Sequence, residues 1–267
     1  MENFFLFLVL AYFITQLPYI LLWAYNKRLI SISVDNMNKV IQLSAKISAY
    51  FQLFNTLIHE LGHIFVAHLT LNKVYKIELS SDRAGLATTS ARNKLTKILI
   101  SLGGYTTSSV FVVFYMSMLN LELYSLLLYI VGGILVFSLI FYVRNAFGIF
   151  WCILMTGLVW SIGRFGTEAL MIKVIILLGA ILVIESIVSS LILIEVNRKN
   201  NATLDSTNSS NDAKDLAEET KIPAMVWSVF FTSFAFICAY IGIRVAFSEP
   251  FESVQELLSF IASFCTS

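Results

Sequence analysis

The chain has 267 residues, of which 58% are hydrophobic and 13% are charged, and its mean hydropathy is +0.80. This composition is typical of an integral membrane protein and argues against a soluble domain with a large core. The formal net charge of +1 gives no indication of a nucleic acid partner. Three cysteines without metal-type spacing argue against a disulfide scaffold.

Six apolar runs are long enough to cross a bilayer, and a shorter one accompanies them. The six lie at about 4–25, 47–71, 98–119, 123–143, 174–194 and 225–247, and the shorter one at about 146–162. We therefore predict an all-α polytopic protein of the cell membrane with six or seven transmembrane helices. The first run has no basic segment before it, so we expect a retained anchor and not a cleavable signal.

The chain divides into three predicted parts. Residues 1–46 form a membrane anchor followed by an interfacial amphipathic segment over 26–46, and residues 47–247 form a membrane-embedded core. Within that core we expect an interfacial loop over 163–173 and a polar loop over 197–222. A short helix in the polar loop is predicted to begin at a Ser210 cap and to end before Pro223. Residues 248–267 are predicted to form an amphipathic tail.

The sequence His59-Glu60-Leu61-Gly62-His63 lies inside the otherwise apolar run 47–71. On a helix, both imidazoles leave the same face one turn apart. One Zn²⁺ can then take a nitrogen from each, while Glu60 lies close enough to serve a metal-bound water as general base. Ionisable residues in a membrane segment are costly and are functional by default. The alternative is a polar cluster that only joins helices.

Residues 74–80 and 85–90 alternate apolar and polar side chains on either side of a turn that contains Asp82. This pattern predicts a small β-hairpin directly after the metal-binding run. Such a hairpin can bind an extended substrate by strand addition, in which case the substrate-binding residues are Gly85, Leu86, Ala87, Thr88 and Thr89. A connector that simply covers the metal-binding helix is the equally weighted alternative.

Two further segments have polar or small residues at unusual places. Gly103 and Gly104 open an apolar run and predict close packing of that helix against the metal-binding helix. Asn145 lies at a tight junction between two apolar runs, where its side chain can hydrogen-bond a substrate carbonyl.

Two histidines do not complete a tetrahedral zinc site, so a further ligand is needed. His68 lies five residues past His63, about 140° around a straight helix, and is expected to face away from the metal. Glu185 has a suitable depth in the run 174–194 but no polar neighbour that marks a shared site.

The basic loop 72–97 is expected to be cytoplasmic, and the loop 195–223 returns to the same side four spans later if 146–162 crosses. Residues 26–46 are also basic, yet a single crossing by 47–71 places them outside. Either the metal-bearing run is not a simple span, or the first loop is an exception to the positive-inside rule.

Together the motifs resemble one known family, the site-2 proteases, which are intramembrane zinc metallopeptidases, and more narrowly their M50B-like branch. The motifs that carry the resemblance are His59–His63, Ile77–Thr89, Leu102–Tyr105, Val143–Gly148 and the acidic stretch Asn211–Pro223 followed by Trp227. No Leu-Asp-Gly occurs in a later span. The resemblance implies Asp212 as the third zinc ligand. The helix dipole alone can also explain an acidic residue in the first turn of a short helix, so Asp215 and Glu185 stay open as alternatives.

The function that follows from this resemblance is zinc-dependent endopeptidase activity on a membrane protein or peptide substrate in the lipid bilayer. Glu60 would then activate the water that attacks the peptide bond. The first alternative is a non-catalytic membrane scaffold or chaperone-like relative with an incomplete site. A metal transporter is disfavoured because the chain has no repeated histidines elsewhere.

Overall fold

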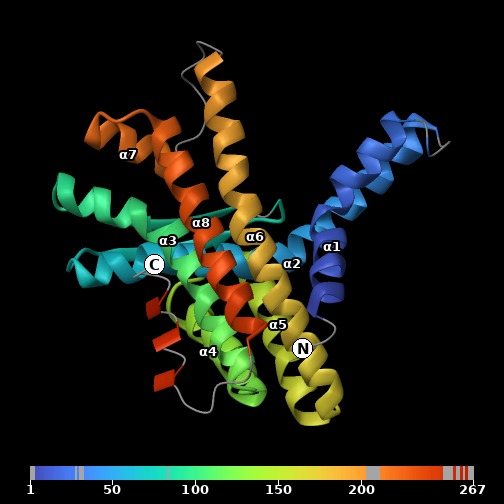
Figure 1. Cartoon of the computed structure of the whole chain (residues 1–267). Helices are drawn as coiled ribbons and strands as arrows, with labels where there is room; N and C mark the ends of the chain where they lie inside the picture. The colour runs from blue at the N-terminus through green and yellow to red at the C-terminus, as the bar shows by residue number, and fades with distance from the viewer. Residues whose placement is uncertain are drawn as a thin grey trace.

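The computed structural model describes residues 4–27, 29, 33–82, 84–202 and 211–248, together with 255–256, 259–260 and 262–263 of the tail. The elements follow one another as α1 (Phe4–Asn26), α2 (Val34–Leu69), β1 (Val74–Leu79), β2 (Gly85–Thr89), α3 (Lys94–Asn120), α4 (Tyr124–Phe141), α5 (Ala146–Phe165), α6 (Glu168–Ala202), α7 (Asp212–Thr220) and α8 (Ala224–Ala246). Figure 1 shows these helices around the short hairpin, with α6 and α8 running side by side.

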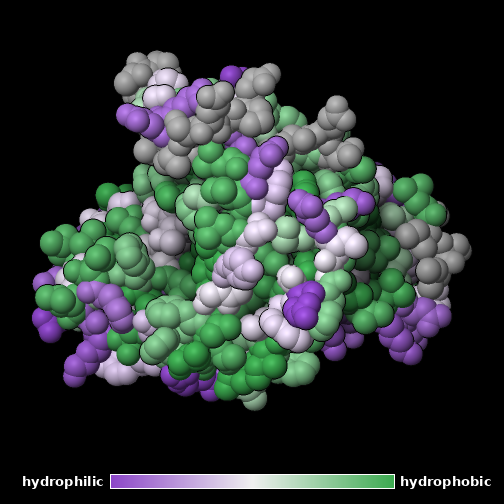
Figure 2. Space-filling model, turned by 90° about the horizontal axis from the view of Figure 1, so that it is seen from below, coloured by the Kyte–Doolittle hydropathy of each residue, from purple (hydrophilic) through white to green (hydrophobic). Residues whose placement is uncertain are grey.

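Six of these helices are long and apolar enough to cross a membrane: α1, α3, α4, α5, α6 and α8. The predicted all-α polytopic membrane protein is therefore confirmed. Most of the side chains that these helices turn outward are apolar, which is expected of surfaces that face lipid. Figure 2 shows hydrophobic side chains over most of the face seen from below, with hydrophilic ones in smaller groups.

The helix that carries the histidines differs from its prediction. We predicted an interfacial segment over 26–46 and a separate span over 47–71, but α2 is one continuous helix of 36 residues from Val34 to Leu69. No glycine or proline interrupts residues 34–61, so polar side chains there do not end the helix. It is not among the six candidate spans. In Figure 1 its ribbon crosses behind α6 and α8.

The hairpin after α2 is confirmed. β1 and β2 pair antiparallel, with Ile77 opposite Ala87. On its other edge, Ile77 pairs with the chain before α5: its N–H donates to the carbonyl of Tyr142 over 2.8 Å, and its carbonyl accepts the N–H of Arg144 over 3.1 Å. β1 is therefore the middle of a three-segment arrangement, and β2 is its outer edge.

Three loop boundaries also differ from the sequence prediction. The loop expected over 163–173 is much shorter, because α5 continues to Phe165 and α6 begins at Glu168. The polar loop expected from residue 197 begins later, because α6 runs to Ala202. The short helix is capped by Asn211 and not by Ser210, which lies outside the described residues, as does most of the predicted amphipathic tail.

The apolar interior has two parts. The larger cluster joins side chains of α1 to α6, the hairpin and α8. A smaller cluster lies under α7 and consists of Leu193, Ala213, Leu216 and Phe231. This second cluster holds the amphipathic α7 against α3, α6 and α8, and the first turn of α7 lies beside the C-terminal half of α2.

Candidate metal centre

His59 and His63 leave the same face of α2, as their spacing predicts. Their Nε2 atoms are 3.1 Å apart, and their rings meet edge to face with centroids 4.8 Å apart. His63 is 8% exposed, so this pair of nitrogens lies inside the protein. Two imidazole nitrogens at this separation can bind one cation together.

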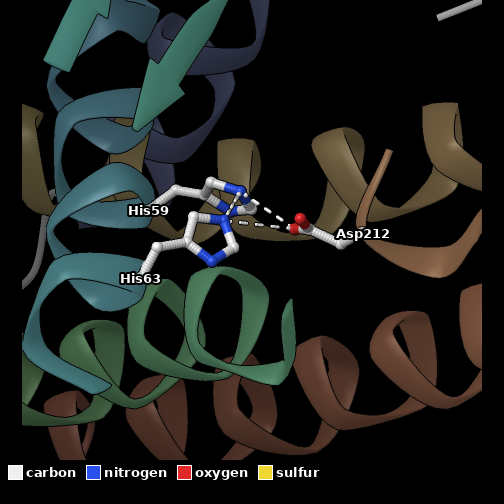
Figure 3. Close-up of side chains that lie close together, drawn as sticks. All are labelled: His59, His63 and Asp212. Carbon is white, nitrogen blue, oxygen red and sulfur yellow. Dashed lines mark hydrogen bonds and ion pairs between the residues drawn. The ribbon is translucent and has the colours of Figure 1, made fainter. Parts of the chain in front are cut away.

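Asp212 completes the group from a distant part of the sequence. Its Oδ2 lies 3.2 Å from Nε2 of His59 and 3.4 Å from Nε2 of His63. Figure 3 shows both rings of α2 turned toward this carboxylate. Burial raises the pKa of the Asp212 carboxyl, but the contacts of this carboxyl with His59 and His63 together outweigh that effect and hold the pKa well below its usual range. Asp212 is therefore ionised at neutral pH.

The three donor atoms fit the geometry of a zinc ion. Zinc bonds of 2.0–2.1 Å in a tetrahedron separate neighbouring donors by about 3.3 Å, and the three observed separations are 3.1, 3.2 and 3.4 Å. Oδ2 of Asp212 is also buried without a hydrogen-bond partner among the described residues. A buried carboxylate oxygen of this kind is satisfied by a cation. These atoms could hold a metal as one face of a tetrahedron, which leaves a fourth position open.

The second nitrogen of His63 is fixed by α3. Its Nδ1 lies 2.7 Å from the carbonyl of Ile100, and a carbonyl can only accept a hydrogen bond. Nδ1 must therefore carry the hydrogen, which leaves the lone pair of the neutral imidazole on Nε2. This arrangement is typical of metal-binding histidines, whose other ring nitrogen donates to a carbonyl or carboxylate.

The glycines of α3 allow it to lie directly against this site, as predicted. A Cβ added to Gly103 would lie 2.8 Å from the carbonyl oxygen of Gly62, and one added to Gly104 would lie 2.5 Å from Nε2 of both histidines. Such separations are shorter than real Cβ contacts. Close packing of α3 on the metal-binding helix is therefore confirmed, and Gly104 forms the wall behind both imidazoles.

Glu60 faces the hairpin. It is 5% exposed, and its Oε2 accepts a hydrogen bond of 2.6 Å from the backbone N–H of Ala87. A Cβ on Gly85 would lie 2.6 Å from Oε1 of Glu60, so the absence of a side chain there makes room for the carboxylate. Because Ile77 bonds to Tyr142 and Arg144, its partner Ala87 directs its N–H away from β1. The outer edge of β2 therefore lies against Glu60, the candidate general base.

A cavity of about 700 Å³ joins these groups. It is lined by the two histidines and Glu60, by all of β2 from Gly85 to Thr89, and by the start of α7, including Asp212 and Asp215. Lys97, Ser101 and Tyr105 of α3 also line it. Sequence reasoning did not single out these three side chains, although Tyr105 stands beside the glycine pair and its ring packs edge to face on His59 at 4.6 Å.

Other candidates from the sequence lie away from the three donor atoms. Asn145 makes two hydrogen bonds to the backbone of Leu79, accepting its N–H over 3.0 Å and donating to its carbonyl over 2.6 Å. Glu185 is buried and accepts a hydrogen bond from Gln16 over 3.3 Å. His68 lies 3.2 Å from the hydroxyl of Tyr142, which agrees with its expected orientation away from the metal.

One of three comparisons with known proteins gave a match. A family model described as Peptidase M50B-like matches residues 37–242, which is more than half of the chain and contains all three donor residues. Neither the curated proteins nor the solved structures gave a match.

Proposed function

The chain belongs to the Peptidase M50B-like family, and we propose that it is a zinc-dependent endopeptidase of site-2 protease type that cleaves a membrane protein substrate. One observation carries the proposal: three donor atoms with zinc-like separations share a cavity with the carboxylate of Glu60. His59, His63 and Asp212 would hold Zn²⁺. Three protein ligands with an open fourth position are typical of catalytic zinc sites.

Glu60 is the proposed general base. Bound zinc would supply a Lewis acid and a water that is more acidic than bulk water. Glu60 would accept the proton of the attacking water and pass it to the nitrogen of the leaving amine. The N–H of Ala87 orients this carboxylate through Oε2 and leaves Oε1 to take the proton.

The substrate would bind along the outer edge of β2. The segment Gly85–Thr89 lines the cavity, and its partner β1 is paired on both sides, so only β2 offers an edge next to the metal centre. An extended peptide that adds to this edge receives backbone hydrogen bonds and passes the donor atoms of α2. Asn145 bonds to Leu79, and in this proposal it supports the hairpin from the other side.

The scaffold alternative predicts a different metal content. A scaffold that keeps the helices has no need for stoichiometric zinc, whereas the proposed enzyme binds one zinc per chain. The transporter alternative requires several sites along a path, and the residues that the structure describes contain one group of three metal-binding side chains.

The test combines zinc analysis with cleavage of a model membrane substrate. We expect the full-length wild type to hold one zinc and to cleave, and Glu60→Gln to hold zinc without cleaving, because an amide cannot accept the proton. Glu185→Gln makes the same chemical change at a buried position away from the cavity and should cleave like wild type. Wild-type activity in Glu60→Gln, or a wild type without zinc, would refute the proposal.

A further inference from the structure

The position of Asp212 depends on how α7 is held. His59 and His63 share one long helix, but Asp212 comes from a helix of nine residues. A helix this short is not stable alone in water, so contacts with α3, α6 and α8 must fix its place. A functional side chain must be held within about 0.5 Å of its productive geometry. The contacts of the first turn of α7 therefore decide whether three donors meet one cation.

A chain of three side chains joins this first turn to α6 and α8. Asn211, the residue before Asp212, donates from Nδ2 to Oδ1 of Asn197 over 3.2 Å. Asn197 in turn donates from its own Nδ2 to Oγ of Ser228 over 2.8 Å. The other end of the Asn211 amide caps α7, because its Oδ1 accepts the N–H of Lys214 over 3.1 Å. Asn211 is thus bound both to its own helix and to α6.

The middle of this chain is sealed from solvent. Asn197 is 1% exposed and Ser228 is fully buried. Oγ of Ser228 donates to the carbonyl of Ala224 in the same helix, so the chain ends on the backbone of α8. A buried polar group that loses its partner cannot turn to water, and the loss is costly. The hydrogen bonds therefore hold Asn197 in one orientation.

Two other described contacts of α7 are less suited to orient its first turn. Ala213 and Leu216 are buried in the smaller apolar cluster, but apolar contacts are not directional. The ion pair between Lys97 and Glu219 lies at the other end of α7 and is partly exposed. Hydrogen bonds depend on angle as well as distance, so the hydrogen bond between Asn211 and the amide of Asn197 constrains the rotation of α7 about its axis.

We propose that Asn197 is a positioning residue of the metal centre, which orients Asp212 toward His59 and His63 through Asn211. The inference rests on the proposed zinc site and adds to it a residue of α6 that does not touch the metal. Loss of a residue that orients a metal ligand typically weakens metal binding about 10–100-fold. We expect an effect of this size on the zinc Kd.

The experiment compares two buried asparagines in the full-length protein. Asn197→Leu removes both hydrogen bonds and keeps the number and branching of the side-chain heavy atoms. The matched control is Asn120→Leu, because Asn120 is 3% exposed and joins α3 to the end of α8 by a hydrogen bond of 2.9 Å to the carbonyl of Val245. The zinc Kd is measured by competition with a chelator, and the ligand geometry by the visible spectrum of the Co²⁺-substituted protein.

Asn197→Leu should raise the zinc Kd about 10–100-fold and change the Co²⁺ spectrum, while Asn120→Leu should lower Tm but keep the wild-type Kd. A Kd for Asn197→Leu within twofold of wild type overturns the inference, and so does equal weakening in Asn120→Leu. If Asn197→Leu does not fold, Ser228→Ala replaces it and should raise the Kd several-fold; an unchanged Kd then overturns the inference. A wild type that binds no zinc refutes the proposed function, and the inference with it.

Discussion

A methyl group at position 104 would enter the space that the imidazoles of His59 and His63 occupy in the candidate metal centre. A Cβ built on Gly104 lies 2.5 Å from Cε1 and Nε2 of His59 and from Nε2 of His63. Ordinary contacts begin at 3.4 Å, so the rings and α3 must separate by about 0.9 Å, the difference between the two distances. That displacement exceeds the tolerance of about 0.5 Å for a functional side chain. Gly104→Ala should therefore raise the zinc Kd by at least about tenfold.

The matched control is Gly133→Ala in α4, since a Cβ there meets nothing within 4 Å. Both substitutions raise intrinsic helix propensity by about 1 kcal/mol, so they differ only in what the methyl group meets. Zinc per chain is measured by elemental analysis, the Kd by competition with a chelator, and helix content by circular dichroism. If Gly104→Ala binds zinc like Gly133→Ala and wild type, the imidazoles do not use the positions described above, and the reasoning is wrong.

Three further predictions follow from the same contacts. Asp212→Ala should lose zinc and activity while Asp215→Ala keeps zinc, and the reverse result would make Asp215 the ligand. Ala87→Pro should keep zinc but lose cleavage, because it removes the N–H that orients the carboxylate of Glu60; full activity would exclude this role. Lys97→Ala should leave the zinc Kd within twofold of wild type. The hydrogen bond from Lys97 lowers the pKa of Glu219. The stabilisation that Lys97→Ala removes is therefore present at neutral pH and disappears as Glu219 is protonated in acid. A Tm difference between Lys97→Ala and wild type that persists below the pKa of Glu219 would show that the ion pair is not its cause.

The histidine pair and the hairpin were predictable because each follows from local spacing. Two residues four apart on a helix must share a face, and alternation on either side of a turn predicts two paired strands. The close approach of α3 was predictable for a similar reason, since Gly103 and Gly104 leave room for a neighbouring backbone. In each case the information lies within a few residues of the feature that it specifies.

The third donor was not predictable from the residues alone. Asp212 is an acidic residue in the first turn of a short helix, where the helix dipole is sufficient to explain it. The resemblance to a family and the predicted return of the polar loop to the metal side favoured it, while Glu185 had no polar neighbour that marks a shared site. The contacts that bring it to the histidines come from Asn197 and Ser228 on other helices, and no local pattern in the sequence indicates that these residues meet.

Helix ends were predicted poorly where hydropathy changes without a residue that breaks a helix. The boundary expected near residue 46 lies inside α2, and the boundary expected near residue 197 lies inside α6. Polar side chains on the surface of a helix leave its backbone hydrogen bonds intact. By contrast, α5 ends at Phe165, directly before the C-cap residue Gly166. Hydropathy marks where a chain meets water, which need not be where a helix ends.

The continuous α2 bears on which side of the membrane the two basic segments, 26–46 and 72–97, lie. A crossing by residues 47–71 would separate the basic segments 26–46 and 72–97, against the positive-inside rule. Because α2 is not among the six candidate spans, both segments can lie on the cytoplasmic side. The four candidate spans from α3 to α6 then return the chain to that side, where α7 begins with Asp212. The polar side chains of the candidate site in α2 also lower the hydropathy of this helix, which accounts for its place outside the six candidate spans.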